Sequence, residues 1–144
     1  ILHDVGRSLV PSIDRGQVEG GFIQGLGWLT REELRFSDDG RLLTHSPDTY
    51  KIPSLGDAPK RFKVALLSDA DQPEVIHGSK AVGEPPFLLA LGVLGALRHA
   101  VGSYHEEGVV ESLPIPCTPE AILSSIAVAQ GELSAAEALL RAKG

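Results

Sequence analysis

The sequence of 144 residues contains no methionine and only one cysteine, Cys117. A single cysteine excludes an internal disulfide and any zinc or iron–sulfur site built from cysteines, and it suits a reducing cytoplasm. The chain begins Ile1-Leu2-His3, which is neither an initiator nor a signal peptide with a basic start and a cleavage site. We therefore expect it to be a piece of a longer polypeptide.

The sequence also lacks clustered positive charge, long apolar runs and paired histidines. Its net charge of −6, without a Lys or Arg cluster, argues against nucleic acid or an anionic membrane as partner. The apolar run Phe87 to Leu97 is far shorter than the roughly 20 residues that span a bilayer, so we expect a buried core helix. No HExxH or similar spacing connects the five histidines, so no metal site made by side chains is expected.

The composition is that of one globular domain, with 42% hydrophobic residues and a mean hydropathy of +0.05. We expect residues 1–144 to form a single domain of mixed α+β class. Apolar periodicity predicts helices over Gln17–Leu29, Phe87–Val101 and Thr118–Ala129, the last with Thr118 as its N-cap and Gly131 at its end. Alternation predicts a strand at Arg61–Leu67, after a loop over Ser46–Pro59.

Shorter signals complete this prediction. Residues 1–13 should be extended, and residues 30–44 should form a hairpin that turns at Gly40. Extended pieces are expected at 75–77 and at 109–110. Ser134 and Glu137 have capping-box spacing, which predicts a last short helix containing Leu139 and Leu140.

The stretch Gly78 to Pro86, with the sequence GSKAVGEPP, places one carboxylate at a defined position. Two prolines suit the first turn of a helix, so Glu84 should lie at or just before the N-cap. The helix macrodipole favours the ionised carboxylate there, while burial against Phe87 and Leu88 would disfavour it, and a general base needs such a balance. Glu84 is therefore a candidate base, and the alternative is that it only caps a helix.

The predicted helix from Gln17 contains an unusual number of glycines, each of which costs about 1 kcal/mol relative to alanine in a helix interior. They are Gly16, Gly20, Gly21, Gly25 and Gly27. Such a helix must be stabilised by close packing, either against another helix or, at its first turn, against a large cofactor. Gln17 lies at that first turn, where its amide could donate and accept hydrogen bonds without adding charge.

Other chemistry finds little support in the sequence. Ser79 lacks the nucleophile-elbow pattern of a hydrolase, and Lys80 does not lie in a phosphate-binding P-loop. Lys80 is therefore expected to be solvated or paired, with a direct role at a cofactor as the alternative.

The sequence GSKAVGEPPFLLA resembles the loop and helix that carry the catalytic glutamate in the molybdenum-binding subunit of xanthine dehydrogenases. The segments ILHDVGRSL, GQVEGGFIQG and TYKIP resemble the last part of the same subunit, in the same order. The match implies a C-terminal part of the molybdopterin-binding domain of a molybdenum hydroxylase. The tail after Val128 is not distinctive.

This resemblance implies oxidative hydroxylation of a purine, hypoxanthine or xanthine to urate, at a molybdenum–molybdopterin centre. Electrons would leave through 2Fe-2S clusters and FAD in a partner subunit or domain of a cytoplasmic, oligomeric enzyme. Glu84 would be the base, Gln17 would hydrogen-bond near the molybdenum, and the backbone of Val82 and Gly83 would lie against the cofactor. Aldehyde-oxidising relatives more often have Ser-Gly after the glutamate, so Pro85-Pro86 favours the purine branch.

Two alternatives stay open. One is an aldehyde oxidase or another molybdenum hydroxylase, and the other is a non-catalytic assembly domain. The substrate-orienting residues of the family would belong to sequence that is absent here, so the isolated fragment is expected to be inactive.

Overall fold

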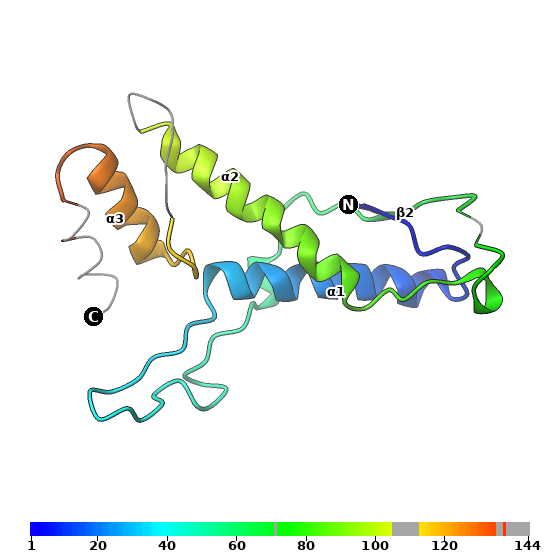
Figure 1. Cartoon of the computed structure of the whole chain (residues 1–144), viewed down its shortest axis with the longest axis horizontal. Helices are drawn as coiled ribbons and strands as arrows, with labels where there is room; N and C mark the ends of the chain where they lie inside the picture. Colours follow the sequence, from blue (N-terminus) through cyan, green and yellow to red (C-terminus); the bar gives the residue numbers. More distant parts are fainter. Residues whose placement is uncertain (71, 105–112, 135–136, 138–144) are drawn as a thin grey trace. The chain divides into compact units, whose positions relative to one another are not determined.

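The computed structural model describes residues 1–70, 72–104, 113–134 and 137, and it combines helices with one small sheet (Figure 1). The elements in order are β1 (Leu2–His3), α1 (Pro11–Thr30), η1 (Leu55–Asp57), β2 (Ala65–Leu66), η2 (Ile76–Gly78), η3 (Pro85–Ala90), α2 (Leu91–Gly102) and α3 (Pro119–Ala129), where η denotes a 3-10 helix. The expected α+β class is confirmed.

The chain divides into two compact units. Unit 1 comprises Ile1–Leu26 and Pro53–Ala90, and unit 2 comprises Gly27–Ile52 and Leu91–Gly144. The expectation of a single domain stays a prediction.

Unit 1 contains the sheet, in which β1 and β2 are parallel and pair Leu2 with Ala65. The amide of Ala65 donates to the carbonyl of Ile1 at 2.9 Å, and the amide of Leu67 donates to His3 at 2.8 Å. The strand predicted over Arg61–Leu67 is thus present but reduced to two residues. Its partner strand, β1, is also only two residues long, which limits the number of backbone hydrogen bonds between the two strands.

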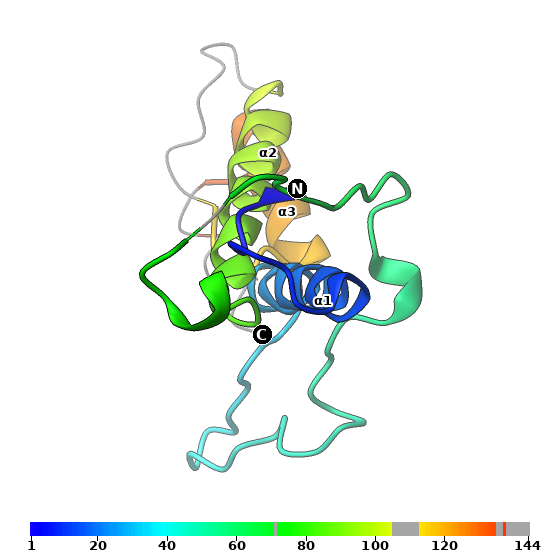
Figure 2. The ribbon, with the colours of Figure 1, turned by 90° about the vertical axis from the view of Figure 1, so that its right-hand side faces the viewer.

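Helix α1 begins at Pro11, so the predicted start at Gln17 is late and the extended segment ends before Ile13. Proline is favoured in the first turn because its missing N–H has no partner there in any helix. The Ser8 hydroxyl donates to Asp14 Oδ2 at 2.6 Å across this first turn. In Figure 2 the helix is viewed nearly end-on.

Two glycines of α1 allow η3 and the preceding loop to approach closely. A Cβ added to Gly21 would lie 2.7 Å from the carbonyl oxygen of Gly83, and one added to Gly25 would lie 2.5 Å from that of Phe87. Real Cβ atoms do not come so close to backbone atoms. Gly16 and Gly20, by contrast, face open space. Close helical packing is therefore confirmed for Gly21 and Gly25.

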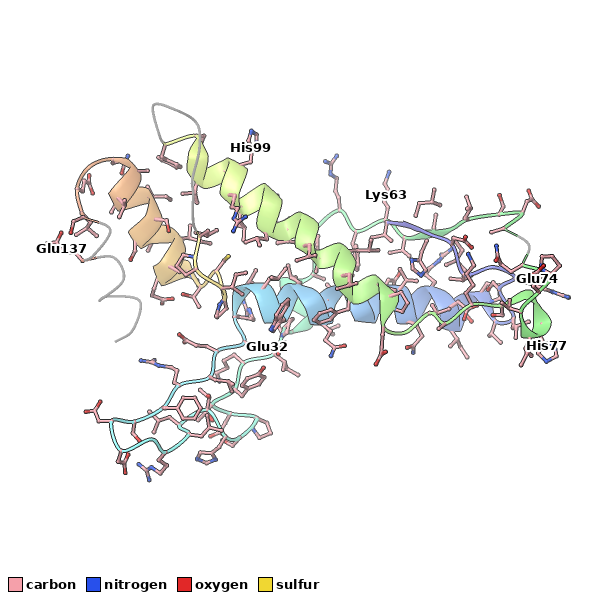
Figure 3. The ribbon with its side chains drawn as sticks, viewed as in Figure 1. Glu32, Lys63, Glu74, His77, His99 and Glu137 are labelled. Atoms are coloured by element: carbon pink, nitrogen blue, oxygen red, sulfur yellow. The ribbon has the colours of Figure 1, made fainter. Side chains whose placement is uncertain are left out.

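The residues before the Glu84 loop form the turn η2, so the extended segment predicted there is wrong. His77 and Gly78 have φ of 58° and 70°, which an extended strand cannot contain. His77 is exposed at this turn (Figure 3). Gly78 uses the conformational freedom of glycine, because positive φ is costly for residues with a side chain.

The helix predicted from Phe87 is a 3-10 helix, η3, that continues into α2. Pro86 and Ala90 are buried, but Leu88, Leu89 and Leu91 are 64%, 43% and 52% exposed. Within the described residues, Pro85–Gly102 is long and apolar enough to cross a membrane by length and composition, with a mean hydropathy of 1.3, and 22% of it is buried. The expectation of a buried helix is wrong for the chain as it stands.

Unit 2 is centred on the contact between α2 and α3. Val101, Leu113 and Cys117 form its buried cluster, with partly buried leucines and isoleucines around them. Burial raises the pKa of the Cys117 thiol, which is free. The predicted N-cap of α3 is confirmed, because Thr118 Oγ1 accepts from the amide of Ala121 at 3.2 Å.

The hairpin of unit 2 is confirmed as one antiparallel bridge, Phe36 to Leu42, with Gly40 at φ 81°. Beyond it, the Tyr50 hydroxyl donates to Glu32 Oε2 at 2.7 Å, and this raises the pKa of Tyr50. The capping box is also present, since Ser134 N–H donates to Glu137 Oε2 at 2.9 Å. The extended piece predicted at 109–110 and the helix at Leu139–Leu140 lie outside the described residues.

The contrast between Gly25 and Gly20 generates a stability prediction. Gly25→Ala should lower the free energy of unfolding by about 1–3 kcal/mol, because the new methyl group overlaps η3. Gly20→Ala, the same change on an open face of α1, should raise it by up to about 1 kcal/mol. Urea denaturation of the two variants measures the difference, and equal responses would contradict the packing described here.

The exposed leucines of η3 and α2 generate a second prediction. Because exposed apolar surface favours association, the isolated chain should oligomerise or aggregate. Light scattering during size-exclusion chromatography tests this. A well-behaved monomer at all concentrations would contradict it.

Candidate functional site

Unit 1 brings Gln17 of α1 next to the loop that carries Gly83 and Glu84. A Cβ added to Gly83 would lie 3.3 Å from Gln17 Oε1, closer than nine in ten real Cβ contacts. Glycine at position 83 therefore leaves room for the glutamine amide. The structure thus brings Gln17 and Gly83 together, and Glu84 is the next residue along the loop.

The Gly83 peptide is also fixed by Gly21, one helical turn after Gln17 on the same face of α1. The Gly83 carbonyl oxygen occupies the space where a Gly21 side chain would begin. Gly83 thus contacts two successive turns of the helix, and this contact determines where the backbone of Glu84 begins.

Glu84 lies immediately before η3, as the two following prolines predicted. Its carbonyl oxygen accepts from the amide of Phe87 at 3.0 Å, which opens the first 3-10 turn. Its side chain, however, is exposed, so the predicted burial against Phe87 and Leu88 is wrong. The carboxylate and the exposed amide of Gln17 are both accessible to a ligand.

Val82 and Lys80 complete the loop. Val82 is half-buried and has no polar side chain, so only its backbone could bind a ligand through hydrogen bonds. Lys80 Nζ donates to Asp4 Oδ2, and the Lys80 amide donates to the Val5 carbonyl at 2.9 Å. The structure therefore places Lys80 in an ion pair.

Asp4 was missed by sequence reasoning, although an Asp two residues before a glycine is a frequent turn former. Its Oδ1 accepts from the Gly6 amide at 2.8 Å. The hydrogen bond from Lys80, and then that from Gly6, lowers the pKa of Asp4. The stabilising contribution of this carboxylate is therefore complete above its unfolded pKa and is lost only as pH falls through the lower folded value.

The chemistry of this site is that of a polar ligand held by neutral donors and acceptors beside one carboxylate. Gly83 has no side chain to exclude such a ligand, and Gly16 and Gly20 leave open space at the same end of α1. Within the described residues, no group of three His, Cys, Asp or Glu could hold a metal ion directly. The exposed amide of Gln17 and the exposed carboxylate of Glu84 fit a larger polar cofactor.

Comparison with known proteins gives a consistent result. Residues 1–59, which include Gln17, match the family described as "Molybdopterin cofactor-binding domain". The chain is 51% identical over 132 residues to a xanthine dehydrogenase of Oryza sativa subsp. japonica, and 50% identical over 125 residues to a xanthine dehydrogenase/oxidase of Gallus gallus. Each match covers 85% of this chain but only 10% and 9% of the relative, so the chain spans about a tenth of their length.

Solved structures share the fold. Quinoline 2-oxidoreductase from Pseudomonas putida 86 superposes with a TM-score of 0.73 and 32% identity, over 87% of this chain and 15% of that one. A Cu,Mo-CO dehydrogenase superposes with a TM-score of 0.72 over 92% of this chain and 16% of the other, and at 20% identity it shows the fold alone.

The resemblance found in the sequence is therefore confirmed by relatives and by fold. In unit 1 the amide of Gln17 contacts the backbone of Gly83, and the next residue, Glu84, has an exposed side chain. Residues 1–59 belong to the molybdopterin cofactor-binding domain family, and the chain over most of its length is similar to the xanthine dehydrogenases.

Proposed function

We propose that the chain is the base-bearing part of a xanthine dehydrogenase, an oxidoreductase that hydroxylates hypoxanthine and xanthine to urate in purine catabolism. The observation that carries the proposal is the contact of Gln17 in α1 with Gly83, the residue directly before the exposed Glu84. The identity of about 50% to proteins named xanthine dehydrogenase supports the same substrate class. Pro85 and Pro86, the residues that favour the purine branch, open η3 directly after Glu84.

In this proposal the amide of Gln17 and the backbone of Val82 and Gly83 hold the molybdopterin cofactor. When bound, that cofactor supplies the oxygen-transfer chemistry and accepts two electrons from the substrate carbon. Gln17 suits its role because an amide both donates and accepts without introducing a charge that would have to be neutralised. The close fit of Gly83 against Gln17 Oε1 orients this amide.

Glu84 accepts the proton that is released as the new carbon–oxygen bond forms. The exposure of its carboxylate supports this role, because a base must reach the proton it removes. A capping role would require the Glu84 side chain to accept a hydrogen bond from a backbone amide of η3, whereas the hydrogen bond at this turn runs from the Phe87 amide to the Glu84 backbone carbonyl. The side chain is thus left available for chemistry.

The rest of the parent enzyme would complete the site and cover the exposed leucines of η3 and α2. We propose that the partners are the remainder of the molybdopterin subunit and a portion with 2Fe-2S clusters and FAD. A cytoplasmic oligomer fits the single, free Cys117. In this assembly Pro85–Gly102 is an internal helix and does not cross a membrane.

Another molybdenum hydroxylase is the second candidate, favoured by the similarity to a quinoline 2-oxidoreductase. Formation of urate from xanthine, compared with oxidation of aromatic aldehydes or quinoline by the same parent enzyme, separates the possibilities. A non-catalytic assembly domain remains the third, and its sign would be a complete product that starts near Ile1 and folds stably without molybdopterin.

The central prediction concerns Glu84→Gln in the full parent enzyme. The amide keeps the shape of the side chain but cannot accept the proton, so kcat should fall by about 10²–10⁴-fold or more. Molybdenum content should be unchanged, because Gln17 and the Gly83 backbone are intact. Steady-state urate formation and metal analysis measure the two quantities.

The matched control is Glu74→Gln, at an exposed glutamate of the same unit (Figure 3). It should leave turnover at the level of the unmodified enzyme. Full activity of the Glu84→Gln enzyme with full metal content would reduce Glu84 to a helix-capping residue.

A further prediction concerns Gln17→Ala. The loss of one neutral hydrogen bond should reduce cofactor retention or turnover by roughly 2- to 13-fold, while base chemistry at Glu84 continues. Gln24→Ala, at another exposed glutamine of α1, is the control and should change neither. If both variants keep full molybdenum content and full turnover, Gln17 has no role at the cofactor.

A further inference from the structure

We propose that Lys80 and Asp4 form a positioning pair for Glu84, which sets the geometry of the proton transfer without touching the substrate. The inference rests on the proposed function of Glu84. It starts from the exposed side chain of Glu84, which packing in the described residues does not hold in place. Its position must therefore depend on how the backbone of the loop is anchored.

One end of the loop is anchored on the N-terminal segment. Besides the ion pair with Asp4, the Lys80 amide donates to the Val5 carbonyl at 2.9 Å. The Arg7 amide donates to the Gly78 carbonyl at 2.7 Å, and Gly6 pairs with Ser79 in an antiparallel bridge. The contact is close, since a Cβ on Gly6 would lie 2.4 Å from the Gly78 carbonyl oxygen.

The Asp4 side chain connects the two sides of this anchor, Lys80 of the loop and Gly6 of the N-terminal segment. One carboxylate oxygen accepts from Lys80 and the other accepts from the Gly6 amide at 2.8 Å. The same side chain thus holds Gly6, at φ 62°, in the turn that contacts Gly78. Loss of Lys80 would leave this carboxylate with only the Gly6 amide.

The other end of the loop is anchored on α1, where Gly83 contacts Gln17 and Gly21. Only Ala81 and Val82 lie between the two anchors. A segment of two residues cannot absorb a large displacement of one end, because each residue spans at most about 3.3–3.6 Å. A displacement at Lys80 is therefore transmitted to Gly83 and to the direction in which Glu84 leaves the loop.

A positioning role and an ordinary structural role predict different results. The Lys80 and Asp4 side chains are 34% and 37% exposed, and pairs of that kind contribute little to global stability. Catalysis is more sensitive, since a displacement of about 1 Å can cost on the order of 10²-fold in rate. The pair should thus matter much more for kcat than for unfolding.

The experiment compares Lys80→Met, Asp4→Asn and Lys80→Arg in the full parent enzyme, with Lys63→Met as the matched control. Lys63 is an exposed lysine of the same unit (Figure 3). The measurements are kcat and KM for xanthine, molybdenum content, Tm, and amide hydrogen exchange over residues 78–84.

We expect Lys80→Met and Asp4→Asn to lower kcat by about 10- to 100-fold with KM nearly unchanged. Molybdenum content and Tm should stay close to those of the unmodified enzyme, while exchange accelerates over residues 78–84 only. Lys80→Arg, which keeps the charge and the donor, should recover most of the rate. Lys63→Met should resemble the unmodified enzyme in every measurement.

Unchanged kcat and exchange in both Lys80→Met and Asp4→Asn would overturn the inference. So would a rate loss accompanied by a large drop in Tm or faster exchange throughout the protein, because the pair would then be structural. If Glu84→Gln retains full turnover, the proposed function itself fails. If Glu84→Gln is inactive and the pair variants are not, only the positioning role fails.

Discussion

The close approach of the segment from Gly83 to Ala90 to one face of α1 is the constraint on which the site depends. Gly21 and Gly25 lie one turn apart on that face, and each leaves room for a backbone carbonyl where a side chain would stand. The contact costs helix propensity at each glycine, about 1 kcal/mol relative to alanine. The same packing places Gly83 against Gln17, and η3 begins immediately after Glu84. One packing surface thus supports the helix and assembles the candidate site.

Local chemistry made part of this arrangement predictable from sequence. Thr118 with Pro119 identified the start of α3, Gly40 identified the hairpin turn, and Pro85 with Pro86 placed Glu84 at a helix start. Each of these signals acts within a few residues, through a fixed φ or a side-chain hydrogen bond. The glycine content of α1 likewise predicted a close contact, although not which glycines make it.

The misses depend on contacts that no local pattern specifies. Asp4 and Lys80 are 76 positions apart, so their pairing requires the fold. His77 adopts φ 58° within η2, in a segment that was expected to be extended. The exposure of Glu84 was also unforeseen, because the apolar run after it predicts burial without saying which part of a protein supplies the covering surface.

The unexpected exposure has one physical explanation under the proposed function, in which other parts of the parent protein cover these residues. A segment that spans about a tenth of its relatives can be locally complete, with caps, turns and a small core, and still leave leucines uncovered. Gln17 and Glu84 are exposed as well, which the proposed contact with a cofactor requires, because a surface that faces a cofactor is not filled by the chain's own side chains. The contacts within this chain position the backbone of the loop that carries Glu84. Gly83 on α1 and Lys80 on Asp4 fix the loop from within unit 1, so the direction of Glu84 is set by contacts that need no other part of the enzyme.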